Sequence, residues 1–104
     1  MEKNIKILID GVPAGERKEL IDVVEILMKE RIQIVKNEMD SMLGLPAVEI
    51  PKERITKCVT LLNNCADKNG IDFHIDEDWD SIEYFMKNSI LDDLAEEFKR
   101  QANA

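Results

Sequence analysis

Apolar residues recur every three or four positions from Glu16 to Leu43, the spacing of an amphipathic helix. On a helical wheel they gather on one side, and polar residues such as Asp22, Lys29 and Asp40 lie opposite. The pattern predicts one long helix of about seven to eight turns, around which the rest of the chain must be arranged. The apolar stripe consists of Leu20, Val23, Val24, Leu27, Met28, Ile32, Val35, Met39 and Met42.

Two charged residues, Arg31 and Glu38, fall near the centre of this stripe. They are about 10.5 Å apart along a helix, too far to pair with each other there. Their spacing fits reciprocal contacts across an antiparallel two-fold homodimer. Alternatively, the helix extends beyond a small core and the two charges are simply exposed, as charged residues usually are. The dimer interpretation predicts self-association through Leu27, Arg31, Val35, Glu38 and Met42.

Two short segments, residues 5–9 and 71–75, have Ile or Phe at every second position. In the second, Ile71, Phe73 and Ile75 alternate with Asp72, His74 and Asp76. A period of two predicts strands with one buried face. Two strands make a poor sheet alone, so we expect a third strand, for which residues 48–50 are a candidate, or strands from a second protomer.

Further helices are predicted after Pro51 and after Asp80. The sequence Asp80-Ser81-Ile82-Glu83 has the spacing of a capping box, and the preceding Trp79 can pack on Tyr84 as a hydrophobic staple. The apolar face changes at Asn88-Ser89, which indicates two helices or one kinked helix. The predicted fold is a helix-dominated α+β domain spanning residues 1–104. Its order is strand, long helix, helix, strand, helix, helix, with a two- or three-stranded sheet.

The composition limits the classes of function. With 44% hydrophobic and 35% charged residues, the chain has the composition of a globular protein, and neither a membrane span nor a signal peptide is evident. We therefore expect a cytoplasmic location. Cys58 and Cys65 are seven positions apart on a predicted helix, too far for a disulfide, so both are expected to be reduced. The net charge of −8 argues against direct binding to nucleic acid or membranes and favours a protein partner with a basic surface.

The densest polar cluster, residues 72–83, holds six acidic residues and one histidine but no Lys or Arg. Its spacing does not fit a calcium loop. Asp72, His74 and Asp76 would project from one strand face, which allows a small metal-dependent enzyme as an alternative, although a single histidine supports it weakly. The chain also lacks a phosphate loop and a nucleophile with a recognisable base. We therefore expect a non-enzymatic protein without a cofactor.

The same cluster can form an acidic recognition surface, with Trp79 and Tyr84 as aromatic anchors. This interpretation predicts a small protein-binding module, an inhibitor or regulator that docks on the basic, nucleic-acid-binding surface of a partner. The alternatives are a self-associating structural module and a capped, solvated helix start without a binding role. The expected contact residues are Asp72, His74, Asp76, Glu77, Asp78, Trp79, Asp80, Glu83 and Tyr84.

Overall fold

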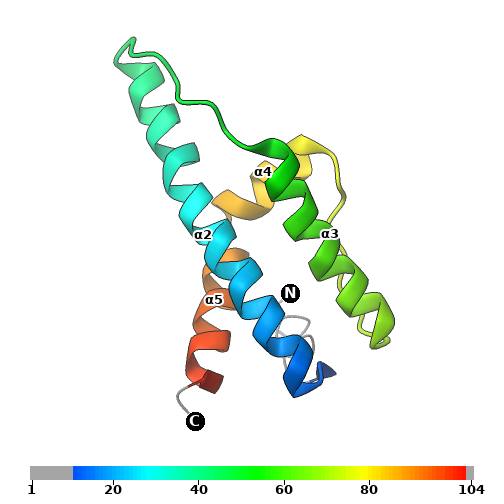
Figure 1. Cartoon of the computed structure of the whole chain (residues 1–104). Helices are drawn as coiled ribbons and strands as arrows, with labels where there is room; N and C mark the ends of the chain where they lie inside the picture. Colours follow the sequence, from blue (N-terminus) through cyan, green and yellow to red (C-terminus); the bar gives the residue numbers. More distant parts are fainter. Residues whose placement is uncertain (1–10, 103–104) are drawn as a thin grey trace.

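The computed structural model describes residues 11–102, and the strand predicted at residues 5–9 lies outside this range. Four helices make up most of the described chain (Figure 1). They are α2 (Ala14–Met42), α3 (Lys52–Lys68), α4 (Trp79–Lys87) and α5 (Ser89–Ala102).

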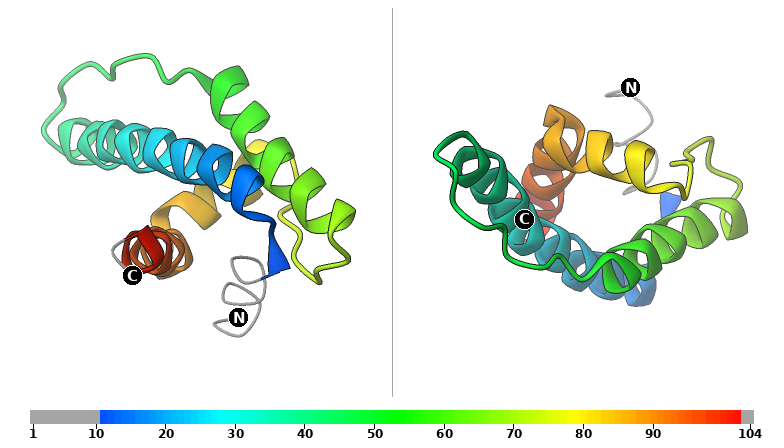
Figure 2. Two further views of the ribbon diagram at one scale, coloured as in Figure 1. Left: turned by 60° about the horizontal axis from the view of Figure 1, so that its bottom comes forward. Right: turned by 90° about the horizontal axis from the view of Figure 1, so that it is seen from above.

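The long helix predicted from the apolar stripe is confirmed as α2, which has 29 residues. The helices α3, α4 and α5 all pack against it. Its C-terminal part extends beyond them, and the connector to α3 returns from its far end (Figures 1 and 2).

Only part of the predicted α2 stripe is buried in the hydrophobic core. Leu20, Val23, Val24 and Leu27 are buried, together with Ile34, which the stripe did not include. The second half of the predicted stripe does not join the core. Ile32 and Val35 point away from the side of α2 that buries Ile34, and the C-terminal end of the helix extends past the shorter helices (Figure 1). The exposed members are Ile32, Val35, Met39 and Met42.

The predicted sheet is wrong for the part of the chain that the structure describes, because residues 11–102 contain no strand. The predicted alternation at residues 71–75 is nevertheless confirmed. Ile71 and Ile75 are buried and Phe73 is half-buried, whereas the side chains between them are exposed. Within residues 11–102, no strand lies beside this segment.

A helix side chain takes the place of the missing strand. The Ile75 N–H donates to Oδ1 of Asn63 at 2.9 Å, and Nδ2 of Asn63 donates to the Ile75 carbonyl at 2.7 Å. Asn37 of α2 binds Val48 in the same two-way manner, at 3.0 and 2.7 Å. The third strand considered at residues 48–50 is therefore also replaced by a segment held on a helix.

The two C-terminal helices separate at Asn88, as the change of apolar face predicted. The N-cap of α4 lies two residues before the predicted one. Asp78 is the N-cap, and its Oδ2 accepts a hydrogen bond from the Ser81 N–H at 3.0 Å. Asp80 instead lies in the first turn. The hydrogen bond from Ser81 lowers the pKa of the Asp78 carboxyl below its ordinary value of 3.8.

Replacing Asp78 by alanine is expected to lower the thermal midpoint at neutral pH, because the first turn of α4 loses its cap. A pKa that is lower in the folded state means that the stabilisation is present above pH 3.8 and is lost as the pH falls through the folded value. Thermal melts at pH 7 and at decreasing pH measure both effects. An Asp80→Ala variant is the control and should melt closer to the unmodified protein. Equal losses at both positions would contradict the assignment of the cap.

Candidate functional site: an acidic cleft

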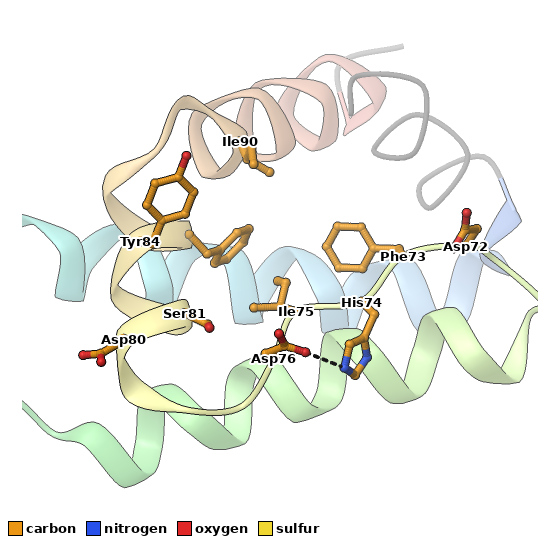
Figure 3. A pocket seen from close by; sticks show the side chains of 10 residues that line it. Asp72, Phe73, His74, Ile75, Asp76, Asp80, Ser81, Tyr84 and Ile90 are labelled. Atoms are coloured by element: carbon orange, nitrogen blue, oxygen red, sulfur yellow. Dashed lines mark ion pairs between the residues drawn. The ribbon is translucent and has the colours of Figure 1, made fainter.

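A cleft of about 540 Å³ opens between the extended segment 72–76, α4 and the start of α5 (Figure 3). It contains five of the nine residues that the sequence analysis assigned to partner binding. The lining residues are Asp72, Phe73, His74, Ile75, Asp76, Asp80, Ser81, Tyr84, Phe85 and Ile90.

The interior of the cleft is apolar. Phe73 and Ile75 point from the extended segment toward Ile90 of α5, and Phe85 of α4 is buried beside them (Figure 3). The alternation of the segment turns Phe73 and Ile75 inward, and the paired hydrogen bonds to Asn63 fix the backbone at Ile75. The sequence therefore positions one wall of the cleft through its period of two.

The rim of the cleft is acidic. Asp72, Asp76 and Asp80 are exposed there, and no Lys or Arg is among the lining residues. Nε2 of His74 lies 3.5 Å from Oδ1 of Asp76, an ion pair when the imidazole is protonated. The Tyr84 side chain, which is 66% exposed, adds an amphipathic group at the edge.

The other four residues assigned to partner binding make contacts outside the cleft. Glu77 accepts a hydrogen bond from the Thr60 hydroxyl of α3, and Asp78 caps α4. The Lys52 Nζ lies 5.1 Å from the centroid of the Trp79 ring, so this aromatic face is already covered by a cation. Oε1 of Glu83 lies 3.4 Å from Nζ of Lys87.

The metal-enzyme alternative gains no support from the geometry. Asp72 lies apart from the His74–Asp76 pair (Figure 3). Within residues 11–102, no group of three or more His, Cys, Asp or Glu side chains is arranged to hold a metal ion.

The residues assigned to self-association differ in their exposure. Leu27 is fully buried and unavailable to a partner, whereas Val35 and Met42 are exposed. The two stripe charges contact other helices. Nη1 of Arg31 lies 2.5 Å from Oδ1 of Asp92 on α5, and Glu38 pairs with Lys87 of α4, which raises the pKa of that lysine. Their position on the stripe is thus explained without a dimer, and self-association stays a prediction.

The apolar lining of the cleft was not predicted from the sequence. The available signal was the helical spacing of Phe85 and Ile90 among the apolar residues on either side of Asn88. This spacing places both residues on the side that faces Phe73 and Ile75, but it does not show that a cleft remains between the two pairs.

None of the helices described here is long and apolar enough to cross a membrane. No family model, curated protein or solved structure matches the chain.

Proposed function

We propose that this chain is a non-enzymatic protein-binding module whose acidic cleft holds a basic and apolar segment of a partner protein. The observation that carries the proposal is the apolar interior beneath a rim of Asp72, Asp76 and Asp80, without a Lys or Arg in the lining.

The apolar interior of the cleft favours an apolar side chain of the ligand, and the acidic rim favours a basic one. An aliphatic or aromatic side chain that enters between Phe73 and Ile90 removes apolar surface from water, which is the main source of affinity. Lys or Arg side chains lay their apolar stems along such a surface and keep their charged ends in water, within reach of the rim. The rim then contributes selectivity and association rate more than affinity.

The chemistry of the ligand indicates the class of partner. Surfaces that combine basic side chains with aromatic ones are typical of proteins that bind single-stranded nucleic acid. A chain with net charge −8 that occupies such a surface would compete with nucleic acid for it. The proposed role is therefore that of an inhibitor or regulator of a nucleic-acid-binding protein.

A fluorescently labelled peptide that alternates Arg and Leu tests the cleft directly by anisotropy. A peptide of Arg and Gly and a peptide of Gly and Leu separate the basic from the apolar contribution. We expect the Arg–Leu peptide to bind most tightly. Its affinity should fall as salt is raised across a few hundred millimolar, because exposed charges are screened. Equal binding of the Arg–Gly peptide would show attraction by net charge alone and contradict the proposal.

Replacing Asp72, Asp76 and Asp80 together by asparagine is expected to weaken Arg–Leu binding at low salt by about tenfold or more. The control removes three exposed acids from other faces, through Glu53→Gln, Asp67→Asn and Glu96→Gln. Both variants change the net charge equally, and each neutralises one acid in a first helical turn, Asp80 or Glu53. Equal weakening by the two variants would place binding outside the cleft.

A further inference from the structure

The C-terminal half of α2 presents a row of apolar side chains to solvent. Their exposed fractions are 68% for Ile32, 39% for Val35, 61% for Met39 and 87% for Met42. Spacings of three, four and three residues are those of the a and d positions in a coiled coil, and the half-buried Met28 continues the row toward the core. We call these five residues the α2 row.

The α2 row is distinct from the buried face of the same helix. At 100° per residue, its centre lies about 100° from the direction of Leu27 and Ile34. Two other sides of this half are engaged within the fold, whereas the side that carries Lys29 and Lys36 is polar and exposed. Arg31 and Glu38 pair with α5 and α4, and Asn37, on the side opposite the row, holds the connector at Val48. The row is therefore the apolar side of α2 that the fold leaves uncovered in the described range.

We propose that the α2 row binds the same row of a second copy of this chain, with the two helices antiparallel. A two-fold axis between positions 33 and 34 would place Ile32 against Val35 of the partner subunit and Met28 against Met39 of the partner subunit. Each of these contacts occurs twice by symmetry. The inference is independent of the cleft.

Charge complementarity favours a second copy in this orientation. The same axis brings Arg31 beside Glu38 of the partner subunit, again twice. A guanidinium has five N–H donors, so Arg31 can bind that carboxylate and keep Asp92. In a parallel dimer Arg31 would instead face Lys36 of the partner subunit, a repulsive contact.

One contact on the other flank opposes the antiparallel dimer, because Lys29 approaches Lys36 of the partner subunit. Each lysine has an acid four residues away on its own helix, Glu25 and Asp40 respectively. Such i,i+4 pairs reduce the repulsion. The flank is exposed, where like charges can separate into water at little cost.

Sedimentation equilibrium of the full chain is expected to show a dimer at tens of micromolar, about the range of a modest interface. The double variant Ile32→Glu, Met39→Glu should raise the dissociation constant at least about tenfold, because four carboxylates would enter the interface. The control is Leu61→Glu on α3, which also replaces an exposed apolar residue and should leave the dimer unchanged. A monomer for the unmodified chain, or a dimer insensitive to the double variant, would overturn the proposal.

Disulfide trapping tests the orientation. In a Cys65→Ser background, Met28→Cys and Met39→Cys proteins are oxidised separately and as a mixture. The antiparallel arrangement yields a cross-link in the mixture and none in either protein alone, since each cysteine would lie about 16 Å along the axis from its own copy. If the Met28→Cys protein and the Met39→Cys protein each form cross-linked dimers alone, and no cross-link joins the two proteins in the mixture, the dimer is parallel and the proposal is contradicted.

Discussion

Replacing Leu62 by alanine is expected to lower the free energy of unfolding by about 2–5 kcal/mol. The side chain lies on α3, is fully buried, and belongs to the core cluster that α2, α4 and α5 share. Truncation removes its apolar surface from the core and leaves a cavity that neighbours on several helices cannot close without moving. Urea unfolding followed by circular dichroism measures the change.

The neighbouring residue provides a matched control. Leu61 lies on the same helix and is 51% exposed, so Leu61→Ala removes the same atoms from a site already in contact with water. Surface substitutions usually change stability by less than about 0.5 kcal/mol. A loss at Leu62 below about 1 kcal/mol, or equal losses at the two positions, would mean that α3 does not bury the face described above.

The helices were the most predictable part of the fold. Periodicity placed the long helix between Glu16 and Leu43, and the structure has it from Ala14 to Met42. The change of apolar face at Asn88 predicted the break before α5. Such patterns record which side of a helix is apolar. They do not record how far the neighbouring helices reach, so they could not show that Met39 and Met42 lie beyond the core.

The prediction of a sheet was wrong for a different physical reason. A period of two reports that alternate side chains face the core, and this was correct for Ile71 and Ile75. It contains no information on the partner of the backbone. The amide of Asn63 satisfies the same two groups that a neighbouring strand would bind. No local pattern indicated this arrangement, because Asn63 lies at the polar edge of the apolar stripe of its helix and is followed by Asn64.

The candidate site was predicted in part. The alternation correctly placed Asp72 and Asp76 on an exposed edge. Trp79 was assigned as an anchor because its chemistry suits an interface, but Lys52 lies over its ring. That contact joins the first residues of α3 and α4, which are distant in the sequence, so no local pattern could predict it.

The paired hydrogen bonds of Asn63 connect the stability of the fold to the cleft. Asn63 is only 2% exposed, and Ile75, which it binds, is also buried. Ile75 lines the cleft beside Phe73, so the geometry of one wall depends on this amide. Removal of the amide leaves both a backbone donor and a backbone acceptor without their partner.

Asn63→Ala is therefore expected to lower the free energy of unfolding by about 2–4 kcal/mol, since each unsatisfied buried group costs about 1–3 kcal/mol. Hydrogen exchange at the amide of Ile75 should accelerate more than exchange in the centre of α2, because the segment loosens before the helices unfold. The adjacent Asn64 is exposed, and Asn64→Ala should change neither quantity appreciably. If the Asn63 variant loses stability while the Ile75 amide keeps its protection relative to α2, Asn63 serves the core and not the cleft wall.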